Sequence, residues 1–159
     1  MESIKTLIVR FDNELKRYEL PKFRGAIIEL IGGDDVYFHN HVDDKFRYAY
    51  PLIQYKRING KAALVCFKEG TDSADKLFLA KNKTIMLGER ELVLELSEMK
   101  SNKFEIGVCD SMLSYRIRGW LPLNSDNFAQ YKKLDSIIEK VEVLQRLLIG
   151  NILSFGKGL

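Results

Sequence analysis

The sequence contains two histidines, His39 and His41, which are separated by a single residue. The ordinary pKa of histidine is about 6.5, so an imidazole can accept and release protons near neutral pH. If this stretch of chain is extended, residues two positions apart point to the same side. One imidazole could then remove a proton while the other, protonated, delivers one to a leaving group. The pair is therefore the candidate for acid–base chemistry.

Two other interpretations of the pair stay open. His39 and His41 would also suit ordinary surface positions in a loop. Together with Asp43 or Asp44 they could ligate zinc or nickel, because imidazole and carboxylate groups both bind these metals. The sequence has no third histidine, however, and the spacing matches no recognised zinc motif. We therefore predict neither a metal site nor a cofactor.

The segment that follows the histidines suits a polyanionic ligand. Residues 45–68 contain no Asp or Glu, and aromatic rings lie among their basic residues. Cations contact phosphates, and aromatic faces stack on unpaired bases. The other interpretation is a solvated strand face whose tyrosines pack on the core. The predicted RNA-binding residues are Lys45, Arg47, Tyr50, Lys56 and Arg57, with a second basic pair at Arg116 and Arg118.

Together the histidines and the cations predict cleavage of RNA without a metal ion. A base removes the proton of a ribose 2′-hydroxyl, whose oxygen attacks the adjacent phosphate, and an acid protonates the departing 5′-oxygen. A nearby cation would stabilise the extra charge on the phosphate. Tyr48 and Lys45 are the nearest candidates for such assistance. The sequence does not assign which histidine is the base and which is the acid.

The elements that must position these residues are predicted to form an α+β domain over residues 1–100. Its order, β-α-β-β-α-β, is that of a ferredoxin-like or RRM-like fold. We expect a loop between the first helix and residue 45, and Asn59-Gly60 is the strongest hairpin signal in the chain. The predicted strands cover residues 4–11, 46–58, 61–67, 84–87 and 91–99, and the predicted helices cover residues 21–30 and 71–79.

The pattern changes over residues 101–159, for which we predict a hairpin followed by a long amphipathic helix. The hairpin joins residues 104–109 to residues 112–121, and Asn124 or Ser125 caps the helix. Apolar residues on one helix face alternate at spacings of three and four: Leu134, Ile138, Val141, Leu144, Leu148, Ile152 and Phe155. This face either covers the sheet of the same chain or pairs with a partner chain. A homodimer through this helix is therefore a candidate assembly.

Length and composition exclude several classes of protein. The 159 residues, 46% of them apolar and 11% aromatic, can bury a full core, which excludes collagen-like and disordered chains. The net charge of +3 decides nothing by itself. Cys66 and Cys109 lie in apolar runs with no CxxC pair, as expected of reduced thiols in a cytoplasmic protein. The first ten residues resemble neither a signal peptide nor a spanning helix, so no membrane partner is expected.

Four strings of the sequence resemble the CRISPR-associated endoribonucleases that cut precursor CRISPR RNA within its repeats. The strings are residues 21–26 (PKFRGA), 38–41 (FHNH), 46–56 (FRYAYPLIQYK) and 148–153 (LIGNIL). The similarity is closest to the branch that carries a His-x-His pair after its first helix. It implies ferredoxin-like domains and metal-independent cleavage of CRISPR repeat RNA to a 2′,3′-cyclic phosphate and a 5′-hydroxyl. It also implies catalytic roles for His39, His41 and Tyr48.

The resemblance further implies that residues 101–159 begin a second ferredoxin-like domain, which family members continue with a glycine-rich loop that grips RNA. We expect the chain to be a truncated form or a naturally short relative, because it ends about where the first helix of that domain would be complete. CRISPR effector proteins are additional candidate partners. The alternative function is a catalytically inactive RNA-binding or dimerising scaffold on the same fold.

Overall fold

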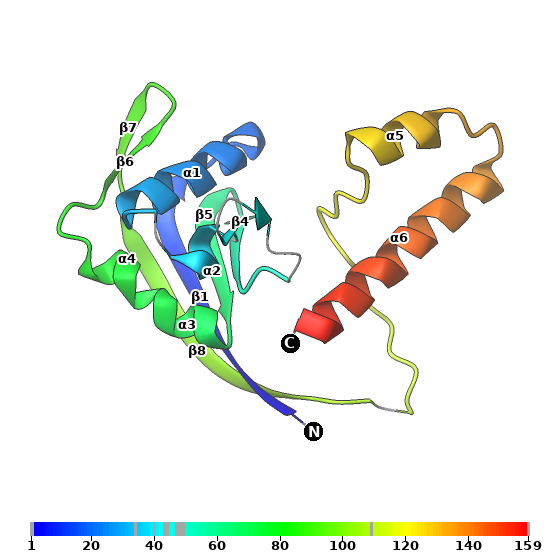
Figure 1. The fold of residues 1–159 in the computed structure, drawn as a ribbon, viewed down its shortest axis with the longest axis horizontal. Helices are drawn as coiled ribbons and strands as arrows, with labels where there is room; N and C mark the ends of the chain where they lie inside the picture. Colours follow the sequence, from blue (N-terminus) through cyan, green and yellow to red (C-terminus); the bar gives the residue numbers. More distant parts are fainter. Residues whose placement is uncertain are drawn as a thin grey trace. The chain divides into compact units, whose positions relative to one another are not determined.

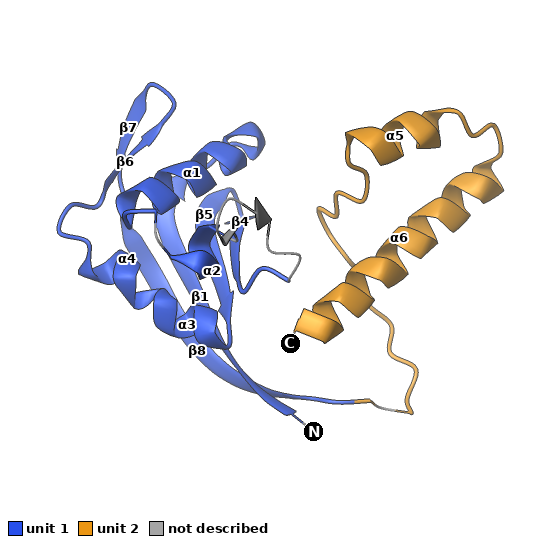
Figure 2. Ribbon diagram, viewed as in Figure 1, with its two compact units in different colours: residues 1–107, 159 blue, residues 108–158 orange. Residues whose placement is uncertain are grey.

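The computed structural model describes residues 2–33, 35–39, 41–42, 45–46, 50–108 and 110–158, with the backbone alone for residues 41, 42, 45 and 46. The chain divides into two compact units, residues 1–107 and residues 108–158 (Figure 2). The prediction that residues 101–159 begin a second ferredoxin-like domain stays a prediction. Within the described residues, no helix is both long enough and apolar enough to cross a membrane.

The first unit is built on a four-stranded antiparallel sheet. Its strands lie in the order β4-β5-β1-β8, with α1, α3 and α4 on one face (Figure 1). The chain runs β1-α1-β4-β5-α3/α4-β8, which is the predicted ferredoxin-like order, so the predicted fold class is confirmed. The bounds are β1 Glu2–Glu14, α1 Leu20–Leu30, β4 Ile53–Ile58, β5 Lys61–Phe67, α3 Glu69–Ser73, α4 Asp75–Leu79 and β8 Leu96–Ile106, with a 3₁₀ turn at Arg17–Glu19 before α1.

The core lies between the sheet and these helices because apolar residues recur at strand and helix periods. Alternate residues of β1 and β5 face the helices, and α1 presents Phe23, Ala26 and Ile27 to them. The Phe11 and Phe23 rings meet edge to face with their centroids 6.2 Å apart. Cys66 is fully buried, and burial raises the pKa of its thiol to about 12. Cys109 lies outside the described residues.

The predicted turn between β4 and β5 is confirmed. Asn59 and Gly60 have φ values of 52° and 87°, in the left-handed region that a two-residue hairpin turn requires and that asparagine and glycine tolerate best. The turn pairs Ile58 with Lys61 and sets the register of the whole β4–β5 ladder.

The segment between α1 and β4 is more structured than predicted. The expected loop contains the four-residue helix α2, Val36–His39, and β2, His41–Val42, which pairs with β3, Lys45–Phe46. Among the described residues of the long strand expected over 46–58, Ile53–Ile58 form β4 of the four-stranded sheet, Phe46 ends β3, and residues 50–52 belong to neither strand. Pro51 accounts for the late start of β4, because proline has no N–H to donate to a ladder.

Two later elements also differ from the predictions. The helix expected at residue 71 begins two residues earlier and is divided into α3 and α4. The strand expected over residues 91–99 is divided into β7, Arg90–Val93, which pairs with β6, Thr84–Leu87, and β8. Buried Asn13 fixes this break, because its amide donates to the Val93 carbonyl (2.8 Å) and accepts from the Glu95 N–H (2.9 Å).

The second unit contains two helices and a long irregular segment. The predicted hairpin is wrong: residues 104–106 belong to β8, which pairs with β1, and residues 112–118 have no regular secondary structure. Asn124 caps α5, Ser125–Lys132, by accepting the Asn127 N–H at 2.8 Å, as predicted. A break after α5 separates it from α6, Ile137–Gly158, so the predicted single helix is two. In the described part of this unit, no side chain is fully buried.

A close approach between α3 and the start of β4 gives a stability test. A Cβ on Gly70 would lie 2.7 Å from the Leu52 carbonyl oxygen, so Gly70→Ala should lower the free energy of unfolding by about 1–3 kcal/mol. Gly25→Ala is the matched control, because no atom outside its chain neighbours and its own helix backbone lies within 4 Å of the new Cβ, and alanine favours a helix by up to about 1 kcal/mol. Urea unfolding followed by circular dichroism measures both. Equal stability of the two variants would contradict this contact.

Candidate active site

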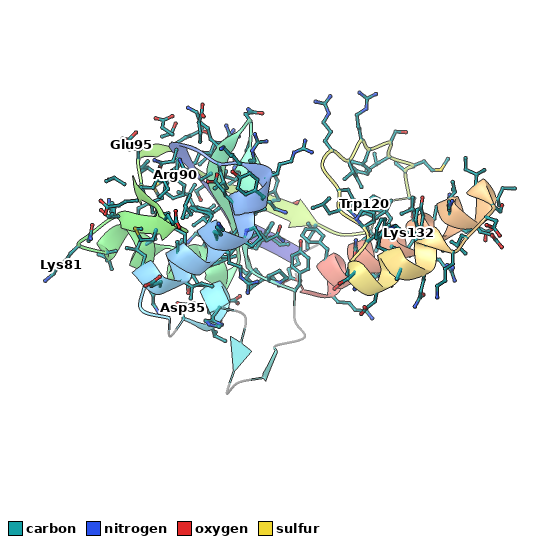
Figure 3. The ribbon with its side chains drawn as sticks, turned by 90° about the horizontal axis from the view of Figure 1, so that it is seen from above. Asp35, Lys81, Arg90, Glu95, Trp120 and Lys132 are labelled. Atoms are coloured by element: carbon teal, nitrogen blue, oxygen red, sulfur yellow. The ribbon has the colours of Figure 1, made fainter. Side chains whose placement is uncertain are left out.

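The helix that carries His39 is held at its first residues by Asp35. The Asp35 carboxylate accepts the N–H groups of Tyr37 (2.8 Å) and Phe38 (3.3 Å) through Oδ1. Its other oxygen, Oδ2, lies 2.7 Å from Lys76 Nζ on α4. Asp35 is buried beside α2 (Figure 3). This carboxylate therefore caps α2 and connects it to α4 through Lys76.

The charge of Asp35 is stabilised in place. Burial alone would raise the pKa of this carboxyl, but the hydrogen bonds from Lys76, Tyr37 and Phe38 outweigh it. The net result is a pKa below the ordinary value, so the carboxylate is ionised at neutral pH.

The other end of α2 is held by hydrogen bonds to its last two carbonyl groups. Arg24 on α1 donates from Nη2 to the His39 carbonyl at 3.0 Å. The Tyr55 hydroxyl on β4 donates to the Phe38 carbonyl at 3.2 Å. The Phe38 side chain is only 1% exposed and anchors the helix in the core. Side chains from α1 and β4 thus fix the backbone on the N-terminal side of His41.

The surroundings of Tyr55 keep its hydroxyl group protonated, so that it remains a hydrogen-bond donor. Its ring meets Phe23 edge to face at 6.1 Å, and the side chain is half-buried. Burial raises the pKa of the Tyr55 hydroxyl well above its ordinary value, with a smaller opposing effect of Arg24. The hydroxyl therefore stays protonated and keeps its bond to the Phe38 carbonyl at any physiological pH.

The predicted catalytic residues are described to different extents. His39 is the last residue of α2; it is half-buried and its Nδ1 atom is buried. The backbone of His41 begins β2, where it pairs with Phe46, and Val42 pairs with Lys45. The β2–β3 pairing therefore brings the backbone of Lys45 close to that of the histidine segment. Tyr48 and Arg47 lie outside the described residues.

Among the predicted RNA-binding residues of the first unit whose side chains are described, Tyr50 and Arg57 have different partners. Tyr50 packs edge to face on Phe67 at 6.4 Å, and its hydroxyl accepts the Gln54 amide. Arg57 donates to the Leu15 carbonyl near the β4–β5 turn and is not part of the wall beside α2.

Lys56 lines the same pocket as Phe38 of α2, and its side chain is exposed. Desolvation lowers the pKa of its amine. Arg116 and Arg118 belong to the second unit, where both are exposed in the irregular segment rather than in the predicted strand.

An open pocket of about 610 Å³ lies beside the C-terminal end of α2, and we call it the α1–β4 pocket. Helix α1 contributes Leu20, Pro21 and Arg24, α2 contributes Phe38, and β4 with its approach contributes Pro51, Ile53, Gln54, Tyr55 and Lys56. Arg24 connects this pocket to the His39 carbonyl.

The sequence reasoning missed Arg24, Gln54 and Tyr55 as residues of the site. Arg24 lies in the string of residues 21–26, and Gln54 and Tyr55 lie in the string of residues 46–56, both of which carry the family resemblance; Tyr55 also lies among the cations of residues 45–68. Within the described residues, no three His, Cys, Asp or Glu side chains come together as a metal site.

Comparison with known families assigns the chain. The family model described as the Cas6b N-terminal domain matches residues 2–105, and the one described as the Cas6b C-terminal domain matches residues 107–159. The chain therefore belongs to the Cas6b family. The resemblance drawn from the sequence strings is confirmed.

Solved structures and one curated protein give particular relatives. A crystal structure described as Cas6b matches with a TM-score of 0.83 and 27% identity, over 99% of this chain and 72% of that one. A second, described as the CRISPR RNA processing endoribonuclease Cas6b, matches with a TM-score of 0.63 and 25% identity, over 96% and 67%. A segment of 54 residues is 45% identical to the uncharacterized protein MJ0978 of Methanocaldococcus jannaschii, covering 33% of this chain and 36% of that protein.

The depressed pKa of Asp35 predicts a pH dependence of stability. A carboxyl whose pKa is lowered on folding stabilises the fold above its unfolded pKa of about 3.9, and this stabilisation is lost as the pH falls through the folded pKa. Asp35→Asn keeps a cap acceptor but loses the charge facing Lys76, so it should cost about 1 kcal/mol at pH 7. Urea unfolding of the natural chain and of Asp35→Asn, measured from pH 7 down to about pH 2, should show that the difference in their free energy of unfolding decreases as the pH falls.

The control for this prediction is Lys76→Met, in which the Asp35→Asn penalty should be smaller at neutral pH because the charge partner is gone. A penalty that is constant over the whole pH range would contradict the assignment of Asp35 as an ionised cap.

Proposed function

We propose that this chain is an endoribonuclease that cuts CRISPR repeat RNA by attack of a ribose 2′-hydroxyl on the adjacent phosphate. The products are a 2′,3′-cyclic phosphate and a 5′-hydroxyl. The observation that carries the proposal is the fixed end of α2, where Arg24 and Tyr55 hold the carbonyls of His39 and Phe38 beside an open, cation-lined pocket. Membership of the Cas6b family and the printed name of one solved relative, a CRISPR RNA processing endoribonuclease, support it.

The chemistry assigns distinct tasks to a small set of residues. His39 and His41 serve as general base and general acid, in either order. Because Nδ1 of His39 is buried, Nε2 is the ring nitrogen that exchanges a proton with RNA. Tyr48 and Lys45 are proposed to stabilise the charge that develops on the phosphate. The mechanism needs no metal ion and no other cofactor.

The RNA path is proposed to follow basic and aromatic side chains on both units. Phosphates make favourable contacts with exposed cations whether or not these also donate to a backbone carbonyl, as Arg57 does. The residues proposed to contact RNA are Lys45, Arg47, Tyr50, Lys56, Arg57, Arg116 and Arg118.

A second candidate function, a dimerising scaffold that binds RNA without cutting it, is favoured by one feature of α6. Ile138 and Ile152 of the predicted apolar face are 67% and 58% exposed, so this helix offers apolar surface for a second copy of the chain or for CRISPR effector proteins. Both functions place the protein in the cytoplasm, where CRISPR RNA is made.

Cleavage of end-labelled CRISPR repeat RNAs in the presence of EDTA tests the proposal. The protein should cut at a fixed position and leave a 2′,3′-cyclic phosphate. His39→Ala and His41→Ala should each lower the single-turnover rate by about 10²-fold or more, as expected for loss of a general acid or base. Lys22→Ala, an exposed cation outside the α1–β4 pocket, is the control and should cut at the rate of the natural chain.

Binding should be separable from cleavage. A repeat RNA with a 2′-deoxyribose at the cut site should bind the histidine variants with nearly unchanged affinity, because the imidazoles act on the reaction rather than on the phosphate charge. If the natural chain binds the RNA but leaves it uncut, the result would favour the function as a scaffold instead. A nearly unchanged rate in the double variant would remove both histidines from the mechanism.

A further inference from the structure

We propose that the α1–β4 pocket is a nucleoside subsite, which holds the base and sugar of one nucleotide next to the cleaved bond. The identification of RNA as the natural ligand rests on the proposed function. The nucleoside chemistry of the pocket rests on its walls, its charge and its position, each of which is visible in the described residues.

The walls of the pocket suit a flat apolar ring. Leu20, Pro21 and Pro51 offer rigid or aliphatic surface beside half-buried Tyr55, and the nearly inaccessible Phe38 and Ile53 close the lining from the core. Proline and aromatic side chains lose little conformational freedom when they bind a ligand. The volume of about 610 Å³ admits a nucleotide and lies within the range of small-molecule sites.

The charge of the pocket suits the phosphates that flank a nucleoside. Arg24 and Lys56 line it, no carboxylate is among its described lining residues, and neither cation forms an ion pair with a described carboxylate. Two other pockets lined by described residues differ in this respect. The one near Arg10 and Lys61 also contains Glu98, 3.1 Å from Arg10, and the one near Arg90 contains Glu19, 3.1 Å from Arg90.

A polar group with a defined orientation also lines the pocket. The Gln54 amide donates to the Tyr50 hydroxyl, which fixes the plane of the amide. An oriented amide offers a donor and an acceptor, and these are the groups that read the edge of a base. Gln54 is thus the residue through which the pocket would prefer one base over another.

The pocket is also next to the proposed catalytic residues. Phe38 forms part of its lining, His39 follows in the sequence, and Arg24 touches both the pocket and the His39 carbonyl. A nucleoside in the pocket would therefore have its phosphate near the end of α2. This places the reacting groups together, as effective cleavage requires.

Nuclear magnetic resonance of the ¹⁵N-labelled chain tests the subsite without relying on cleavage. The probes are the four nucleoside 3′-monophosphates, with ribose 5-phosphate and inorganic phosphate as comparators, each titrated to millimolar concentration. At least one nucleotide should shift the amide signals of residues 20, 22–24, 38–39 and 53–56 in a saturable way. Ribose 5-phosphate should bind about tenfold more weakly, because it lacks the base that contacts the apolar walls.

Variants assign the site within the fold. Lys56→Ala should raise the dissociation constant of that nucleotide about fivefold, and Gln54→Ala should narrow the differences among the four bases. Lys22→Ala, on the same helix as Arg24 but outside the pocket, is the matched control. It should change neither the dissociation constant of the nucleotide nor the differences in affinity among the four bases.

Two results would overturn the subsite: no saturable shift in these segments, or equal affinity for the nucleotides and for inorganic phosphate. Either result could coexist with RNA cleavage by the natural chain. Conversely, saturable nucleotide binding in a chain that cuts no RNA would support the pocket and contradict the proposed function. The two proposals therefore fail separately.

Discussion

The hydrogen bonds that α1 and β4 donate to the end of α2 are the constraint on which the candidate site depends. A helix of four residues cannot be stable by itself, because nucleation costs more than so few bonds return. Here Asp35 caps the first turn, Phe38 is buried in the core, and the last two carbonyls accept from Arg24 and Tyr55. Arg24 and Tyr55 belong to α1 and β4 of the ferredoxin-like fold. The histidine segment therefore depends on that fold for its position.

The ferredoxin-like fold, which we call the frame, positions the residues that hold α2. The register of β4 places Tyr55, and the turn at Asn59 and Gly60 sets that register. Gly70 lets α3 approach the backbone just before β4. The walls of the α1–β4 pocket come from the same frame, whereas the cations proposed for RNA binding are mostly exposed. The contacts proposed to position the reacting groups and the charges proposed to bind RNA thus differ in exposure, although Lys56 and Arg57 lie on the same strand as Tyr55.

Local signals in the sequence were sufficient for much of the fold but not for the site. The turn at Asn59 and Gly60 and the cap at Asn124 depend on residues close in sequence, and both could be predicted. Helix α2 could not, since it has no periodic pattern and its partners Arg24, Tyr55 and Lys76 lie far along the chain. The predicted strand over residues 91–99 missed the break imposed by the Asn13 amide. The predicted hairpin after residue 104 failed because β8 finds its partner in β1.

The hydrogen bond from Tyr55 to the Phe38 carbonyl offers the most direct test of how the histidine segment is positioned. Tyr55→Phe removes one hydroxyl and keeps the ring, so its effect on single-turnover cleavage at saturating repeat RNA reports the positioning of the histidine segment. Tyr18→Phe, at an exposed position, is the matched control. We predict a rate about tenfold lower for Tyr55→Phe with unchanged RNA affinity, because small displacements of reacting groups are costly. Equal rates for the two variants would contradict the claim that this bond positions the site.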